Sequence, residues 1–316
     1  MAGDAAQVDK SIRIKGFAAG VASGVTKLAI GQPFDIIKVR LQCSPPGVYK
    51  GALDCLLKTL RLEGPRALYK GASAPLFGWG LSDSVLLGSL HNYRVWLARL
   101  ESNGQSYTSS ARAQTKQEQE ELGIKSLSVF GHGVAGLLAG CTVCTVITPI
   151  EMIKARLQMQ THSTTKEFTG PIDVIQKVYR QNGPFGLYRG FGATLLFRSN
   201  FGFMFATYEV LMRQFRAMPN MSTGTSNFLA GGLSSFVFWT FAFPADAVKN
   251  RLMSDSLYQP RYNGVRQAAR AIWSEGGIRA VFRGFTPCIL RSFPTNASAL
   301  FVYETTMRFM DAEQVA

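Results

Sequence analysis

Charged residues are scarce in this sequence of 316 residues, where they make up 17%, against about 25% in ordinary soluble domains. The scarcity argues against a pair of soluble domains, one of the two organisations that the length allows. Glycine, with 31 residues, and phenylalanine, with 22, are plentiful instead. The composition therefore favours a membrane protein whose helices pack closely together.

Cysteine is also sparse, and the five cysteines are scattered, so no disulfide framework is indicated. Cys141 and Cys144 form a CxxC pair within apolar sequence and without a second ligand pair. This setting favours helix packing over a metal or redox site. The three histidines have no catalytic spacing with a nucleophile, which argues against an enzyme. We expect neither a metal nor a cofactor.

The N-terminus lacks a familiar targeting signal, because it contains Asp4 and Asp9 and has no apolar core behind a basic start. An organelle address is therefore expected to be internal. The net charge of +14 fits nucleic acid, anionic lipid or an anionic solute as a partner. Nucleic acid is disfavoured, because the bases are spread along the chain and form no recognisable binding module.

The sequence does have a threefold internal repeat. PFDIIKVRLQ at residues 33–42 recurs as PIEMIKARLQ at 149–158 and as PADAVKNRLM at 244–253, and all three fit P-x-[D/E]-x-x-K-x-R. Each copy is followed by an aromatic-x-Gly element, an amphipathic segment and an aromatic-[K/R]-Gly element. The glycines of the first element are Gly51, Gly170 and Gly264, and those of the second are Gly71, Gly190 and Gly284.

Each repeat has an apolar segment before its proline and another after its closing glycine. The six candidate spans are 14–42, 72–99, 127–158, 190–216, 226–253 and 285–310, each long enough to cross about 30 Å of hydrocarbon. None is purely apolar, and charges such as Arg198 and Arg291 need protein or water around them. The sequence predicts an all-α membrane protein with six transmembrane helices in three tandem repeats around a polar cavity, plus short connecting helices.

The predicted organisation is an N-terminal tail at 1–13, repeats at 14–100, 124–218 and 219–312, and a polar segment at 101–123 between the first two repeats. This segment has no hydrophobic periodicity. It is interpreted as a disordered or solvated connection, or as a regulatory or partner-binding segment.

The acid and the first base of each motif lie three residues apart, so on a helix they share one face. A single copy would be a weak local pair on a solvated helix end. Three copies allow each acid to meet the base of a neighbouring repeat, in a ring of pairs. The pairs are Asp35 with Lys154, Glu151 with Lys249, and Asp246 with Lys38. The prolines would kink the helices and let their ends converge. Such pairs break easily, which suits a gate that alternates around a solute bound midway.

From about Ile14 to Met310 the sequence resembles the mitochondrial carrier family, to which this triple motif is highly specific. The resemblance implies six tilted transmembrane helices, three short matrix helices, both termini in the intermembrane space, and a monomer in the inner mitochondrial membrane. It makes the ring the matrix gate, braced by Gln42 and Gln158, with Met253 departing from the pattern. The six glycines of the two short elements match the family's cardiolipin sites, or else are only turn glycines.

The family's cytoplasmic gate follows [F/Y]-[D/E]-x-x-[K/R], and this pattern is incomplete here. Glu209 and Glu304 supply acids, but methionines take the two basic positions. On the second helix Arg94 supplies the base while His91 replaces the acid. Only Arg94 with Glu209 would form a full pair, so the resemblance implies a weak cytoplasmic gate and a strong matrix gate.

In the family the solute is bound by residues about midway along the second, fourth and sixth transmembrane helices. Counting along the repeats places Gly78 with Trp79 there on the second helix and Arg291 on the sixth. On the fourth helix two counts disagree by one residue, and Arg198 comes next, as a ligand or in a structural role. A guanidinium grips a carboxylate through two hydrogen bonds, so the arginines favour a solute that carries a carboxylate.

Lys27 and Asp83 are further charges at bilayer depth, either as ligands or as buried polar contacts, and Asp83 suits an ammonium group. RSFPTNASALFVYE, which begins at Arg291, resembles the sixth helix of the carnitine/acylcarnitine and basic amino-acid carriers. The predicted function is exchange of a carboxylate-bearing metabolite, such as an amino acid or carnitine ester, by alternating access. A nucleotide or coenzyme A carrier is a second possibility, and a tether or receptor that has lost transport is a third.

Overall fold

The computed structural model describes residues 2–101, 123–124, 126–160, 167–218 and 221–310. Side chains are described in these ranges except those of residues 2–18, 77, 79, 223, 293, 296, 297, 300, 303, 304 and 307. Residues 102–122, nearly all of the predicted polar segment, lie outside the description. The described residues form helices and no strand, which confirms the predicted all-α class.

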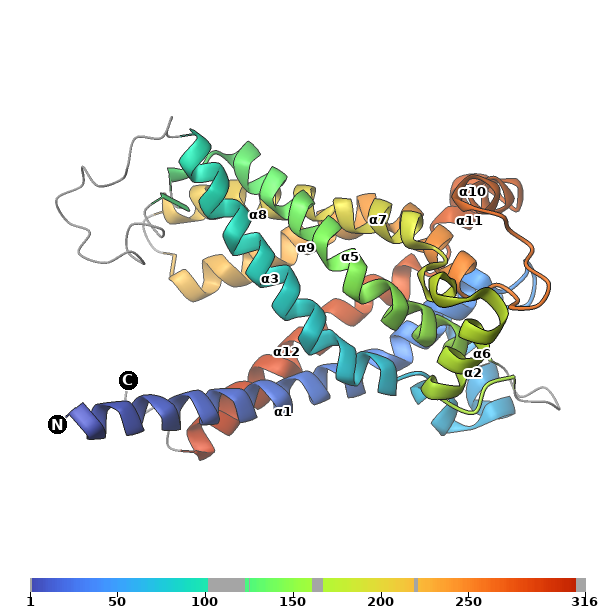
Figure 1. Cartoon of the computed structure of the whole chain (residues 1–316), viewed down its shortest axis with the longest axis horizontal. Helices are drawn as coiled ribbons and strands as arrows, with labels where there is room; N and C mark the ends of the chain where they lie inside the picture. The colour runs from blue at the N-terminus through green and yellow to red at the C-terminus, as the bar shows by residue number, and fades with distance from the viewer. Residues whose placement is uncertain (1, 102–122, 125, 161–166, 219–220, 311–316) are drawn as a thin grey trace. The chain divides into compact units, whose positions relative to one another are not determined.

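Long helices coincide with the six predicted apolar spans (Figure 1). They are α1 (Ala2–Cys43), α3 (Ser73–Glu101), α5 (Val129–Met159), α7 (Phe191–Ser199) with α8 (Phe201–Arg216), α9 (Thr223–Met253) and α12 (Phe285–Phe309). The amphipathic segments form α2 (Ala52–Glu63), α6 (Pro171–Asn182) and α10 (Val265–Ser274). A short helix of five residues follows each of them. These are the 3₁₀ helices η1 (Pro65–Tyr69) and η3 (Pro184–Tyr188) and the α-helix α11 (Gly277–Val281).

Two boundaries differ from the prediction. Helix α1 begins at Ala2, so the predicted tail is helical almost from its start. The fourth span is divided between α7 and α8 at Asn200, whose side-chain amide donates to the carbonyl oxygens of Leu196 at 2.7 Å and Phe197 at 3.3 Å. An asparagine that bonds to nearby carbonyls competes with the helical hydrogen bonds and so favours an interruption.

Among the residues that the structure describes, two helices are long and apolar enough to cross a membrane by length and composition alone. They are α5, over Val129–Met159, and α9, over Gly224–Met253. Polar residues such as Lys27 in α1 and Arg291 in α12 dilute the hydropathy of other predicted spans, and the break at Asn200 divides the fourth. The prediction of six spans therefore rests on the repeat rather than on hydropathy.

The chain packs as two compact units, and each draws on more than one sequence repeat. The first contains Met1–Phe77, Ile153–Lys177 and Arg283–Ala316, and the second contains Gly78–Met152 and Val178–Phe282.

In the first unit α12 lies along α1, and α2 packs on the C-terminal part of α1 through Cys55, Ile37 and Leu41. In the second unit α9 packs against α7, α8 and α10. One of its hydrophobic clusters is aromatic, because the rings of Phe197 and Phe201 contact that of Phe238.

Candidate functional site

Asp35, the motif acid of the first repeat, is a buried carboxylate with two cationic partners in the first unit. Lys154 donates from Nζ to Oδ2 at 2.6 Å, and Arg291 donates from Nη1 to Oδ1 at 2.7 Å. The contact with Lys154 is the one that the ring predicts. The contact with Arg291 joins the motif acid to the residue that the sequence puts forward as a solute ligand.

Glu151, the motif acid of the second repeat, has the same kind of partners within the second unit. Lys249 lies 3.1 Å from its Oε2, and Arg198 donates from Nη2 to Oε1 at 2.8 Å. Both acids therefore use one oxygen for the motif lysine of the next repeat and the other for an arginine of an even-numbered span.

The third motif acid, Asp246, lies 3.1 Å from Lys249 and accepts a hydrogen bond from Asn250 at 3.1 Å. Lys38 belongs to the other unit, so the pair of Asp246 with Lys38 stays a prediction. Gln42 and Gln158 are both buried, and their bracing role also stays a prediction.

Arg198 is held by aromatic rings as well as by Glu151. Its guanidinium carbon lies 5.4 Å from the ring centre of Phe197 and 5.3 Å from that of Phe201. Lys249 lies 4.3 Å from the centre of the same Phe197 ring. Cations over aromatic faces are attracted electrostatically, so Arg198 is fixed within the helix packing. The sequence offered one signal for these ring contacts, namely the presence of Phe197 and Phe201 close to Arg198.

The remaining solute candidates are distributed between the units. A Cβ atom at Gly78 would lie 2.7 Å from the side chain of Ile150, so close packing of α3 on α5 accounts for this glycine. The side chain of Trp79 lies outside the description. Lys27, in the first unit, and Asp83, in the second, are both exposed.

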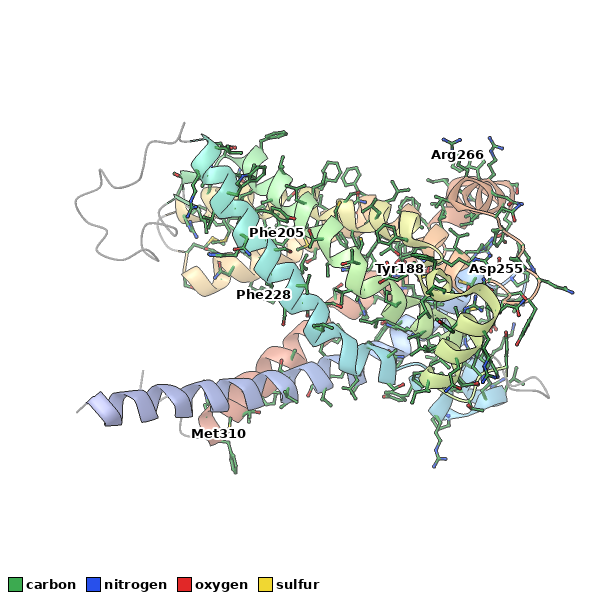
Figure 2. All side chains as sticks on the ribbon, viewed as in Figure 1. Tyr188, Phe205, Phe228, Asp255, Arg266 and Met310 are labelled. Atoms are coloured by element: carbon green, nitrogen blue, oxygen red, sulfur yellow. The ribbon has the colours of Figure 1, made fainter. Side chains whose placement is uncertain are left out.

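The acid at the predicted cytoplasmic gate has a base that the sequence pattern overlooked. Glu209 accepts a hydrogen bond at 2.8 Å from Nε of Arg213, and Nε2 of His132 lies 3.8 Å from its other oxygen. Arg94 lies over the ring of Phe205, labelled in Figure 2, at 5.2 Å, and is close enough to Glu209 to be attracted by its charge. An acid and a base four residues apart share a helix face, so Glu209 has a partner within α8 itself. The pairing of Arg94 with Glu209 between helices stays a prediction. The side chain of Glu304 lies outside the description.

The predicted cardiolipin glycines fall into two groups. Gly71, Gly190 and Gly284 have φ angles of +74°, +93° and +87°, in the left-handed region that favours glycine. Cβ atoms there would lie 3.1 Å from the Lys154 carbonyl, the Met253 side chain and the Lys38 carbonyl, respectively. Backbone geometry and packing thus account for these three. Gly51, Gly170 and Gly264 have no atom within 4 Å of a Cβ and no left-handed φ, so packing does not account for them.

The second base of the motif is tied to the short helix that follows it. Buried Arg40 donates to both oxygens of Glu63, at 2.6 and 2.9 Å, and Arg251 pairs with Glu275 in the same way. Asn182 holds the corresponding position in the second repeat. The recurrence of this glutamate before a glycine, in EGPRALYKG and EGGIRAVFRG, was the available signal.

The base of the aromatic-[K/R]-Gly element contacts the loop of the following repeat. Lys70 donates to the carbonyl of Gln160 at 2.8 Å, and Arg189 donates to Asp255 at 2.7 Å and to the carbonyl of Tyr262 at 3.0 Å. Asp255, labelled in Figure 2, also accepts from the backbone of Arg261. These contacts tie each base to residues that follow the motif of the next repeat.

Replacing Glu63 with glutamine is expected to lower the free energy of unfolding by about 3 kcal/mol, because buried Arg40 would lose its compensating charge. Burial raises the pKa of Glu63, but hydrogen bonds from Arg40 and Lys70 outweigh it and hold the pKa below its ordinary value. The stabilisation is therefore complete above pH 4.5, the ordinary value, and is lost as the pH falls through the lower pKa of the folded state.

Thermal unfolding between pH 7 and pH 3 measures this effect. Asp54→Asn is the control, because that carboxylate lies on the same helix in a solvent-exposed pair with Lys58 and its loss should change little. A variant at Glu63 as stable as the wild type at pH 7 would contradict the prediction.

Cys141 and Cys144 are free, and the Cys144 thiol donates to the carbonyl of Gly140 at 3.2 Å. Within the described ranges, no cluster of three or more His, Cys, Asp or Glu side chains could hold a metal ion. Helix packing is the setting of this CxxC pair.

Comparison with known proteins gives consistent similarities over nearly the whole chain. The family model described as mitochondrial carrier protein matches residues 11–100, 125–219 and 221–314. Mitochondrial substrate carrier family protein L of Dictyostelium discoideum is 32% identical over 94% of this chain and 96% of its own. Mitochondrial magnesium exporter 1 of Drosophila melanogaster is 36% identical over 96% and 97%. The mitochondrial basic amino acids transporter of Bos taurus is 31% identical over 94% and 93%.

Proposed function

This chain belongs to the mitochondrial carrier family, and we propose that it exchanges a carboxylate-bearing metabolite, such as an amino acid or a carnitine ester, across the inner mitochondrial membrane. Members of the family are transporters rather than enzymes. One observation carries the choice of solute: Arg291, the candidate ligand on the sixth span, already binds a carboxylate, that of Asp35. A guanidinium in a confined site that accepts a carboxylate from the protein also suits a carboxylate from a solute.

In the proposed cycle, the motif pairs form the matrix gate and the group around Arg94, Glu209 and Glu304 forms the cytoplasmic gate. The pairs of Asp35 with Lys154 and of Glu151 with Lys249 support the first assignment. The pair of Glu209 with Arg213 lies within α8, so it joins no two helices and adds no strength to the proposed cytoplasmic gate. A solute favours one gate state only through contacts that differ between the states.

Exchange of a divalent cation is the second candidate, because one relative is named a magnesium exporter. The charges disfavour it. Magnesium is held by oxygen ligands, usually including carboxylates, whereas Asp35 and Glu151 each already have two cationic partners. The relative named a basic amino acids transporter fits the carboxylate proposal better. Transport of a nucleotide or coenzyme A, and a tether or receptor role without transport, are two further candidates.

Uptake into proteoliposomes tests the proposed function. The purified protein would be reconstituted into cardiolipin-containing vesicles, and each batch of vesicles would be loaded with one unlabelled solute. Uptake of the labelled solute would then be measured for amino acids, carnitine esters, oxo acids, nucleotides and Mg²⁺. Counter-exchange of an amino acid, carnitine ester or oxo acid is the expected result. Exchange of nucleotides alone, or of Mg²⁺ alone, would assign that solute instead. Failure of the folded protein to exchange any of them would favour the tether or receptor.

We also propose that the protein works as a monomer and that cardiolipin binds at the backbone amides beside Gly51, Gly170 and Gly264. The second proposal rests on the open surroundings of these glycines at the starts of α2, α6 and α10. Phosphate groups bind readily at helix N-termini, where amide groups are unpaired and the helix dipole is positive.

Gly51→Ala is expected to leave the protein's stability in detergent nearly unchanged but to reduce the stabilisation that added cardiolipin gives. Gly71→Ala should instead cost about 1–2 kcal/mol with or without lipid, because the left-handed backbone disfavours alanine. Thermal unfolding across a cardiolipin titration separates the two effects. If Gly51→Ala keeps the full response to cardiolipin, this glycine belongs to a turn and not to a lipid site.

A further inference from the structure

The carboxylate of Asp35 is shared between two cations that differ in position and freedom. Lys154 comes from the neighbouring motif in α5, and Arg291 comes from α12. Each occupies a different oxygen, so loss of one partner leaves the other contact in place. Breaking the contact with Arg291 would therefore leave Asp35 still compensated.

Arg291 packs against α1 at Gly31, a buried residue without a side chain. A Cβ atom at Gly31 would lie 3.6 Å from Cδ and 3.8 Å from Nη1 of Arg291. Lys27, Gly31 and Asp35 follow one another at intervals of four residues, so they share a face of α1. The Arg291 side chain thus packs, together with Thr295, against the buried backbone of Gly31. Lys27, which is exposed, lies one turn further along this face.

The arginine of the second unit is restrained differently. Arg198 contacts Glu151 and two phenylalanine rings, which hold its guanidinium among packed helices. Arg291 lies beside a glycine instead of aromatic rings, and 22% of its side chain is exposed, against 17% for Arg198. Of the two arginines, Arg291 has the setting in which one anionic partner is more readily exchanged for another.

We propose that Asp35 is a built-in competitor for the solute: the solute's carboxylate displaces the carboxylate of Asp35 from Arg291, while Asp35 stays on Lys154. This inference rests on the proposed function. It identifies the step by which solute binding weakens a contact of the proposed matrix gate. One carboxylate replaces another, so the guanidinium is never left buried without a counter-charge, which would be strongly unfavourable. A solute with no carboxylate cannot make this exchange.

The exchange links binding to gate opening. Before it, two contacts hold Asp35, one to α12 and one to α5. After the exchange, Asp35 keeps its contact with Lys154 and has lost its contact with Arg291. The closed gate has therefore lost one interaction, and the solute has gained one with Arg291. A solute shifts the balance of two states only by such differential contacts.

Asp35→Asn tests the proposal, because the amide keeps the size of the side chain and removes the competing charge. The probes are L-arginine, L-carnitine and 2-oxoglutarate, titrated into purified protein and followed by thermal unfolding, with L-argininamide as the probe whose carboxylate is replaced by an amide. If Arg291 is released from Asp35 in about a tenth of wild-type molecules, the variant should bind the best carboxylate probe about tenfold more tightly. L-argininamide should gain nothing.

Lys154→Gln is the second variant and should act in the opposite direction. Without Lys154, Arg291 is the remaining one of the two partners of Asp35, so Asp35 should hold Arg291 more firmly. The carboxylate probe, which competes with Asp35 for Arg291, should therefore bind more weakly. Asp246→Asn is the matched control, since this motif acid contacts Lys249 and Asn250, and it should not tighten binding.

Tighter binding in Asp35→Asn, together with weaker binding in Lys154→Gln, is the expected result. Equal affinities in wild type and both variants, or an equal gain for L-argininamide, would overturn the competition. Absence of binding by every probe in both wild type and Asp35→Asn would overturn it as well. The uptake assay is read separately, so exchange of a carboxylate solute without these shifts would leave the proposed function intact and remove only the competition.

Discussion

Arg291→Ala is expected to abolish counter-exchange of the carboxylate solute, with a loss of roughly a hundredfold in rate at low solute concentration. A charge-assisted pair of hydrogen bonds contributes up to about 3 kcal/mol, which corresponds to that factor. Stability should stay near that of the wild type, because Asp35 keeps its contact with Lys154. The measurements are initial uptake into proteoliposomes and thermal unfolding of the same preparation.

Arg198→Ala is the matched comparison for Arg291→Ala, since both arginines contact a motif acid. Its removal should mainly lower the melting temperature, because Arg198 also contacts the rings of Phe197 and Phe201. If Arg291→Ala instead collapses the fold while Arg198→Ala leaves stability unchanged, the roles assigned to the two arginines are reversed.

Glu151→Gln is expected to have the largest effect on stability, a loss of about 3–5 kcal/mol in the free energy of unfolding. The carboxylate lies between Arg198 and Lys249, and the side chain of Lys249 is only 5% exposed. Removing one partner of a buried charge group leaves the others without compensation. Asp246 still contacts Lys249, so the loss should fall on Arg198 more than on the lysine.

Chemical denaturation in detergent, with Asp173→Asn as the control, measures this loss. Asp173 pairs with Lys177 on the solvent-exposed surface of α6, and such pairs contribute little. A Glu151→Gln protein that unfolds at the wild-type denaturant concentration would mean that Arg198 and Lys249 are compensated by other groups.

The helical architecture was predictable because the sequence repeats it three times. Proline, acid and bases recur in the same order, and the short elements around Gly51 and Gly71 mark the helices between the long segments. The contacts of Asp35 with Lys154 and of Glu151 with Lys249 follow from the same recurrence. A pattern that occurs three times reports on symmetry, and symmetry brings together residues that lie far apart in the sequence.

What the repeat missed depends on residues that occur only once. The break at Asn200 comes from one side chain that bonds to two carbonyls. The pair of Glu209 with Arg213 lies one position outside the expected spacing. The second partner of each motif acid, Arg291 or Arg198, comes from an even-numbered span whose register the repeat specifies only to within one residue. Such contacts depend on local packing, which a repeat pattern does not contain.

The most direct test of the central claim is a comparison of counter-exchange for a carboxylate solute and for its carboxamide by the same proteoliposomes. The account predicts saturable exchange of the carboxylate by the wild type, little exchange of the amide, and neither with Arg291→Ala. Two results would contradict the claim that Arg291 binds the carboxylate of the solute. One is equal exchange of the carboxylate and the amide, and the other is exchange of the carboxylate solute that persists in Arg291→Ala.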